Sequence, residues 1–211
     1  MSLSKDNLCI MIENCLERIR LAKDYLHLHR ILNECQQEWL LEMNKSPAFF
    51  QIIMRGLQHS YIMETFKLYD SNKDSLSIEK LLDICQSNSK YFRTEHIDIH
   101  QSVDDNWPDE YITTKINTLD DIANAKVELL NFATKINNLT IRRNKFYAHS
   151  DKRYVSNLKS LENNAPFTYG DLDDLLMFAN KICNTLLFNL NGRRYLTQSS
   201  NIEDVKNLFH S

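Results

Sequence analysis

Glycine and proline are scarce in this chain of 211 residues, which contains three of each. The glycines, Gly56, Gly170 and Gly192, are far apart. Dinucleotide-binding loops, nucleotide phosphate-binding loops and the G-x-S-x-G turn of hydrolases all need clustered glycines, so these classes are excluded. The same scarcity argues against a turn-rich β-sandwich. We therefore expect a mostly helical protein.

The chain also lacks an excess of positive charge. It has 25 Lys and Arg against 28 Asp and Glu, a formal net charge of −3. Any nucleic-acid binding must therefore come from a local basic patch. The five cysteines are an odd number and include no C-x-x-C pair. This usage predicts free thiols in a reducing cytoplasm and not a disulfide framework.

Long hydrophobic runs are absent as well. No stretch of about 18 apolar residues occurs, which is the length that a membrane-spanning helix needs. Charges interrupt the N-terminal residues from Lys5 onward, unlike a signal peptide. We expect a cytoplasmic protein without a membrane span. The hydrophobic fraction of 43% is typical of a globular chain with a packed core.

Apolar residues recur at steps of three and four in several long segments, which is typical of amphipathic helices. The first segment is either one helix or two with a break. Its stripe carries Cys15, Tyr25, Leu28 and Cys35, and the histidines beside it, His27 and His29, are expected at the surface or its boundary. The predicted helices cover residues 5–43, 47–69, 78–86, 118–149 and 169–191, with a short one after 200. The sum is an all-α bundle of five or six helices.

Capping residues mark the ends of these helices. Ser46 offers a capping hydroxyl before a proline at the first helical position, and Ser77 offers another. Thr118 stands three residues before an aspartate, a variant of the capping box, and the sequence Thr168-Tyr-Gly-Asp171 is expected to start another helix. Gly192 follows the last long helix and is suited to end it.

Three parts of the chain differ in organisation. Residues 1–44 form an N-terminal helical segment, residues 45–192 form the helical bundle, and residues 193–211 form a tail with a short helix. Within the bundle, residues 88–117 show no clear period and are predicted to be an irregular insert.

Two patterns invite a comparison with metal sites. Asp70 opens a D-x-N-x-D sequence, but Ser75 and Leu81 stand where a calcium loop needs its glycine and its bidentate glutamate. Residues 96–100 read H-I-D-I-H, which would place three metal-capable side chains on one face of a strand. Nothing nearby completes a ligand set, so we predict a polar loop or short extended piece, no metal and no cofactor.

The informative stretch is residues 142–153, Arg-Arg-Asn-Lys-Phe-Tyr-Ala-His-Ser-Asp-Lys-Arg. Arg143 falls on the apolar stripe of its helix, where a charge must find a partner or face a wet cleft. In an ideal helix His149 shares its azimuth with Arg142, seven residues earlier, whereas Arg143 is offset. The densest basic cluster of the chain comprises Lys135, Arg142, Arg143, Lys145, Lys152 and Arg153.

An arginine and a histidine suit RNA cleavage without a metal. Histidine titrates near neutrality and can remove the proton of the 2′-hydroxyl. The guanidinium fork matches phosphate oxygens and can stabilise charge on the scissile phosphate. The alternative is structural, because Arg143 could instead extend along the surface or pair with an aspartate of another helix.

The string R-N-K-F-Y-A-H-S-D-K resembles the motif of the HEPN superfamily, in which an arginine and a polar residue precede a histidine by four to six positions. Residues 68–70 and 75–82 also resemble its abortive-infection (AbiU-type) branch, so the resemblance covers about residues 45–190. It maps the motif arginine onto Arg143, the polar residue onto Asn144 and the histidine onto His149.

The resemblance implies a helical bundle that dimerises and cuts RNA without a metal in phage defence or a toxin–antitoxin system. Catalysis is then expected from Arg143, Asn144 and His149, with an RNA substrate, a second copy of the chain and an antitoxin protein as partners. RNA-binding or supporting roles are expected for Arg142, Lys145, Tyr147, Asp151, Lys152 and Arg153. The alternatives are a non-catalytic HEPN module that binds a protein or nucleotide, and a helical interaction domain in which Arg143 forms an ion pair.

Overall fold

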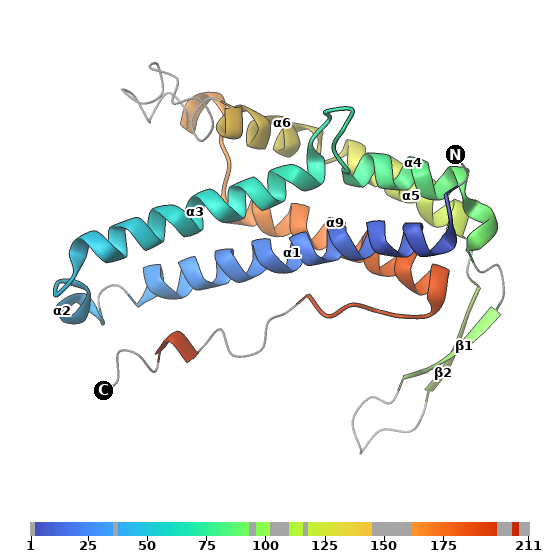
Figure 1. Cartoon of the computed structure of the whole chain (residues 1–211), viewed down its shortest axis with the longest axis horizontal. Helices are drawn as coiled ribbons and strands as arrows, with labels where there is room; N and C mark the ends of the chain where they lie inside the picture. Colours follow the sequence, from blue (N-terminus) through green and yellow to red (C-terminus); the bar gives the residue numbers. More distant parts are fainter. Residues whose placement is uncertain are drawn as a thin grey trace.

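The protein is an elongated helical bundle with one β-hairpin (Figure 1). The structure, a computed structural model, describes residues 3–35, 38–92, 96–101, 110–115, 118–144, 162–197 and 204–206, the two strands by their backbone only. The elements are α1 (Lys5–Glu34), α2 (Leu40–Met43), α3 (Pro47–Tyr69), α4 (Ile78–Ser87), the 3₁₀ turn Ser89–Tyr91, β1 (His96–Gln101), β2 (Glu110–Lys115), α5 (Thr118–Leu130), α6 (Ala133–Arg142) and α9 (Tyr169–Asn191).

The main core lies between α1, α3 and α9, which run alongside one another in Figure 1. On α1, a stripe that includes Leu8, Ile12, Leu16 and Ile19 is fully buried. Residues spaced three and four apart share one helix face, so this spacing explains why α1 presents a continuous apolar side to two partners. The core therefore joins the N-terminal helix to the rest of the bundle, and the division predicted at residue 44 remains a prediction.

A second apolar cluster lies where α1, α2 and α3 meet at one end of the bundle. The short helix α2 turns the chain back there between the two long helices. The buried members of this cluster are Ile31, Leu32, Trp39, Met43 and Leu57.

The insert contains regular structure. β1 and β2 form an antiparallel pair whose register runs from His96 opposite Lys115 to Gln101 opposite Glu110. Figure 1 shows this hairpin projecting from the bundle beside the junction of α4 and α5. The short extended piece expected within residues 88–117 is thus one strand of a two-stranded ladder.

Most helix boundaries agree with the sequence prediction. α3 begins at Pro47 and ends at Tyr69, and α4 begins after Ser77, whose hydroxyl accepts from the Lys80 amide. The N-terminal segment takes the option of two helices with a break. The all-α bundle is confirmed, and the described residues hold seven labelled α-helices, more than expected.

The extra helix arises from a break in the predicted helix 118–149. α5 ends at Leu130 and α6 begins at Ala133. At the break the Phe132 ring packs 5.0 Å from the Phe178 ring of α9. No local sequence pattern predicts this contact, because the two rings are far apart in the sequence.

Two predicted caps do not form. The Ser46 side chain makes no capping hydrogen bond, so Pro47 is the working start signal of α3. Thr118 is the first residue of α5, and its buried hydroxyl has no hydrogen-bond partner among the described residues. By contrast, all five cysteines are free thiols, as predicted. No helix in the described part of the chain is both long and apolar enough to cross a membrane.

The prediction for His29 was wrong. His29 is buried, with 7% of its surface exposed. The apolar stripe of α1 continues after Ala22 through Leu26 and His29, and Tyr25 and Leu28 are only partly buried. His29 is accommodated in the interior because the Tyr169 hydroxyl lies 3.1 Å from its Nδ1 atom.

Candidate functional site

The first part of the predicted motif lies at the C-terminal end of α6. Arg142, Arg143 and Asn144 are described there. The other predicted site residues, Lys145, Tyr147, His149, Asp151, Lys152 and Arg153, lie outside the described residues.

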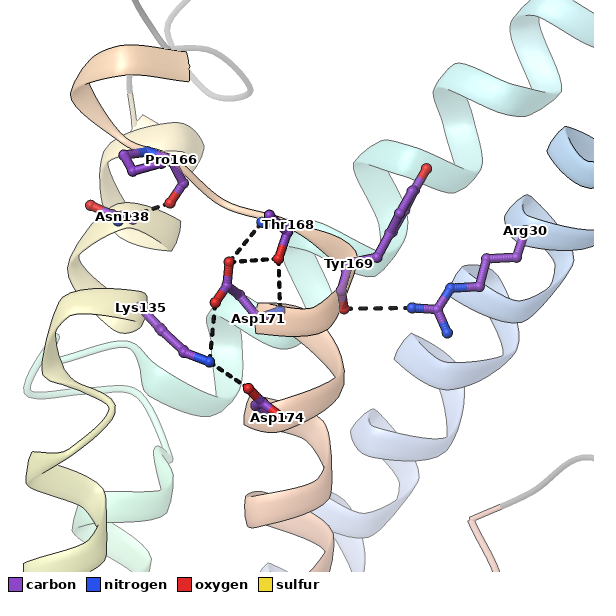
Figure 2. Close-up of polar contacts among 8 residues, drawn as sticks. All are labelled: Arg30, Lys135, Asn138, Pro166, Thr168, Tyr169, Asp171 and Asp174. Carbon is purple, nitrogen blue, oxygen red and sulfur yellow. Dashed lines mark hydrogen bonds and ion pairs between the residues drawn. The ribbon is translucent and has the colours of Figure 1, made fainter.

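The end of α6 is fixed to the segment that leads into α9. Asn138 donates through Nδ2 to the Pro166 carbonyl at 2.9 Å (Figure 2), and Arg142 donates through Nε to the Ala165 carbonyl at 2.7 Å. Asn138 and Arg142 are four residues apart and so share one face of the helix. Leu139 is fully buried beside them. Arg142 therefore has a structural contact that anchors the helix end.

Arg143 has a different environment. Its guanidinium carbon lies 4.7 Å from the centre of the Phe66 ring on α3, a cation–π arrangement. Its Nη1 donates to Asn144 Oδ1 at 2.8 Å, while its Nε is buried and has no hydrogen-bond partner among the described residues. Phe66 and Asn144 thus orient the Arg143 side chain without cancelling its charge.

No carboxylate of the described residues forms an ion pair with Arg143. A half-buried guanidinium without a counter-ion is costly, so it is suited to a site that receives an anion. This arrangement differs from the ion pair that the structural interpretation of Arg143 required.

The helix also changes its winding at this point. α6 is α-helical to Arg142, and Arg143 and Asn144 continue it as a π-helical turn. A π turn closes i→i+5 hydrogen bonds, so Arg143 and Asn144 depart from the ideal α-helical geometry that aligned Arg142 with His149. His149 itself lies outside the described residues.

Lys135 does not contribute free positive charge to the predicted basic cluster. Its ammonium forms ion pairs with Asp174 and, at 3.1 Å, with Asp171, both on α9 (Figure 2). The hydrogen bonds from Asp174 and then Asp171 raise the pKa of Lys135. This residue fastens α6 to the start of α9 instead of facing a ligand.

The start of α9 is itself built around a capping box. Asp171 accepts from the Thr168 amide and hydroxyl at 2.8 Å, while the Asp171 amide donates to the Thr168 hydroxyl at 3.2 Å (Figure 2). Burial raises the pKa of the Asp171 carboxyl, but hydrogen bonds from Thr168 and Lys135 outweigh it and lower that pKa overall. This confirms the helix start predicted at Thr168 and adds a reciprocal capping box to it.

The sequence patterns did not predict the aromatic cluster around Tyr169. Its ring lies near His29 of α1 and Tyr61 of α3, and the Arg30 guanidinium carbon lies 5.3 Å from its centre. Arg30 is also paired with Asp173 at 2.7 Å. The one available signal was the spacing from Ala22 through Leu26 to His29, which keeps the histidine on the buried side of α1.

The D-x-N-x-D loop already contains a cation from the chain itself. Lys80 donates through its ammonium to the carbonyls of Asn72 and Ser75, the latter at 3.1 Å. Asn72 and Asp74 use their amides to close turns on the side chains two residues earlier. Asp70 Oδ1, Asn72 Oδ1 and two loop carbonyls thus already accept hydrogen bonds within the chain. No metal-capable cluster occurs in the portion of the chain that the structure describes.

The H-I-D-I-H segment forms β1, so His96, Asp98 and His100 occupy alternate positions on one face of the strand. Their side chains lie outside the described structure. A role for them as metal ligands has no further support.

An all-α bundle with the R-N motif at the C-terminal end of α6 is typical of HEPN-type proteins. The family model of AbiU2 (HEPN_AbiU2) matches residues 7–208, and the chain belongs to this family. The match includes α1 and the tail, which the motifs of residues 45–190 alone did not connect to the family. Neither a search of curated proteins nor a search of solved structures found a match.

Proposed function

We propose that this protein is a metal-independent endoribonuclease of a phage-defence or toxin–antitoxin system. The observation that carries the proposal is the environment of Arg143, which is oriented by Phe66 and Asn144 but has no carboxylate partner among the described residues. Such a cation is suited to bind a phosphate with its guanidinium fork.

In the proposed reaction His149 removes the proton of a ribose 2′-hydroxyl. The 2′-oxygen then forms a bond to the adjacent phosphorus, and the bond from phosphorus to the 5′-oxygen of the next nucleotide breaks. The products are a 2′,3′-cyclic phosphate and a 5′-hydroxyl, the latter protonated by a general acid. Arg143 stabilises the negative charge that grows on the phosphate oxygens.

Asn144 supports this role from its bond to Arg143, because it fixes one of the guanidinium nitrogens. The Nε of Arg142 already donates to a backbone carbonyl, so we do not assign this residue to catalysis. We assign it instead to RNA positioning. The remaining basic residues Lys145, Lys152 and Arg153 would contact flanking phosphates, and Tyr147 and Asp151 would support His149.

We further propose that two copies of the chain associate through α5. Leu119, Val127 and Leu130 are 48%, 65% and 72% exposed, and with the exposed Ala123 they form a second apolar stripe on the outer side of this helix. The opposite side, with Ile122 and Ala125, is buried. An isologous contact of this stripe would bring two motifs into one assembly and double the catalytic groups.

The test of the reaction is cleavage of a structured RNA in excess EDTA, followed by analysis of the new ends. We expect undiminished cleavage and 2′,3′-cyclic phosphate termini. Loss of activity in EDTA with rescue by magnesium would contradict the mechanism. Retention of the fold and of RNA binding without any cleavage would instead favour a non-catalytic HEPN module.

The dimer is tested separately by light scattering coupled to gel filtration. The parent should have twice the monomer mass at tens of micromolar, and Val127→Asp should lower that mass by half. Leu196→Asp is the matched control, because Leu196 is 85% exposed but lies outside α5. A monomeric parent would contradict the proposed association of two copies.

A further inference from the structure

Figure 1 shows α1, α2 and α3 meeting at one end of the bundle. Residues of these helices and of the turn before α3 line an apolar groove of about 340 Å³ there. Its apolar lining consists of Leu32, Leu40, Met43, Pro47, Phe50 and Met54. Large apolar side chains beside it are unusually accessible, since Leu41, Phe49 and Ile52 are 80%, 58% and 69% exposed. A concentration of exposed apolar surface of this kind marks a contact site.

The tail of the chain leads toward this groove. Thr197 accepts from the Lys23 ammonium of α1 at 3.1 Å and donates to Asn180 of α9 at 3.0 Å, so the segment after α9 is held against the bundle. Farther on, Val205 packs against the apolar cluster that joins α1, α2 and α3. Two residues of this cluster, Leu32 and Met43, also line the groove.

The residues that follow match the groove in chemistry and spacing. Leu208 and Phe209 stand three and four positions after Val205, so in a helical turn all three share one face. Leu208 and Phe209 can lie at most ~10–14 Å from Val205, the span of three to four fully extended residues. Asn207 and His210 fall between and beyond these apolar positions.

We propose that Leu208 and Phe209 dock into the groove of their own chain, with Val205 as the first contact of the same face. The tail would then hold α1, α2 and α3 together and cover part of the exposed apolar surface. This docking is independent of the proposed nuclease activity, because it rests on the groove, the Val205 contact and the order of residues after it.

Methionine methyl groups offer a direct test in the full-length chain. Met43 and Met54 line the groove, whereas Met11 packs against the main core and serves as an internal control. In protein labelled at the methionine methyl groups, the ring of Phe209 should displace the resonance of Met43 or Met54. The change Phe209→Leu removes the ring current but keeps an apolar side chain, so that resonance should move while the Met11 resonance stays.

Two further variants sharpen the result. Leu208→Asp should release the segment and shift the same resonances, and Asn207→Ala, on the opposite side of the turn, should leave them in place. Unchanged Met43 and Met54 resonances in both Phe209→Leu and Leu208→Asp would overturn the proposal. A shift that appears only on concentration, together with an association that Leu208→Asp abolishes and Val127→Asp leaves in place, would show that the groove takes the tail of a second copy, and the intramolecular docking would be wrong.

Discussion

The end of α6 and the start of α9 lie side by side (Figure 2). They differ in whether their cations have carboxylate partners. At the start of α9, Lys135 pairs with Asp171 and Asp174, and Arg30 pairs with Asp173. At the end of α6, Arg143 rests on an aromatic ring with no carboxylate partner among the described residues. Lys135 and Arg30 at the start of α9 are therefore compensated by carboxylates, whereas Arg143 contacts an aromatic ring and an amide oxygen.

The same contrast separates two adjacent arginines. Arg142 donates through Nε to the Ala165 carbonyl, while Arg143 contacts the Phe66 ring on α3 and donates to Asn144. The two neighbouring arginines therefore contact different partners where the winding of the helix changes between them.

The largest effect is expected at Arg143. Arg143→Ala should lower RNA cleavage by roughly 10²–10⁴-fold, because the charge on the scissile phosphate loses its partner. Arg143→Lys should restore only part of it, since an ammonium cannot reproduce the fork. The measurement is the single-turnover rate with saturating protein.

Arg142→Ala is the matched comparison for that experiment. It should weaken RNA binding, reduce its salt dependence and cost about 1 kcal/mol of stability through the lost bond to Ala165. Both variants must keep the helical circular dichroism of the parent. If Arg142→Ala is inactive and Arg143→Ala loses only stability, the two roles are reversed.

A smaller effect is expected at the cap of α9. Asp171→Ala removes the two hydrogen bonds that its carboxylate accepts from Thr168 and one ion pair of Lys135, so it should lower the free energy of unfolding by about 1–2 kcal/mol. The check is urea denaturation. Because this site is structural, the cleavage rate per folded molecule should stay unchanged, and a loss comparable with that of Arg143→Ala would undo the distinction between the two regions.

Replacing Gly56 by alanine should change the free energy of unfolding by a smaller amount and in the opposite direction. Gly56 lies within α3, and a Cβ placed there would meet nothing within 4 Å. Gly56→Ala should therefore raise the free energy of unfolding by about 0.5–1 kcal/mol, because alanine loses less backbone freedom on folding. Thermal or urea unfolding of this variant decides the point, and destabilisation would mean that the position is constrained by something other than the described neighbours.

The smallest effect is a difference in pH dependence at His29. Burial lowers the pKa of His29 in the folded protein, so the unfolded chain binds its proton more readily. The His29 ring lies against the Tyr61 and Tyr169 rings in the interior, where burial disfavours the charged imidazolium. This contribution to stability is complete above the unfolded pKa and is lost as the pH falls through the folded pKa.

His29→Gln removes this titration and keeps a polar side chain. Between pH 7 and pH 5 the parent should lose more stability than the variant, measured as the shift of the urea midpoint. Parallel curves for the two proteins would show that His29 does not titrate differently in the folded and unfolded states.

Local signals in the sequence were sufficient for the long helices. Pro47 begins α3, the Thr168–Asp171 box begins α9, and Gly192 ends it in the left-handed conformation with φ of 76°. Each signal acts within one helical turn, so it can be recognised without knowledge of the fold.

Features that depend on tertiary contacts could not be predicted in this way. The break before α6 accompanies the packing of Phe132 on Phe178, and the burial of His29 needs the hydroxyl of Tyr169, 140 residues away. At the candidate site the sequence identified Arg143 as a misplaced charge, but its placement on Phe66 is known only once α3 and α6 are packed together.

His149→Ala tests the central claim most directly, because the proposed chemistry needs this side chain as the group that takes the 2′-hydroxyl proton. The rate of RNA cleavage in EDTA should fall by roughly 10²–10⁴-fold in this variant, while its circular dichroism and its mass stay those of the parent. Cleavage at the parental rate by folded His149→Ala protein would contradict the assignment of this motif to catalysis.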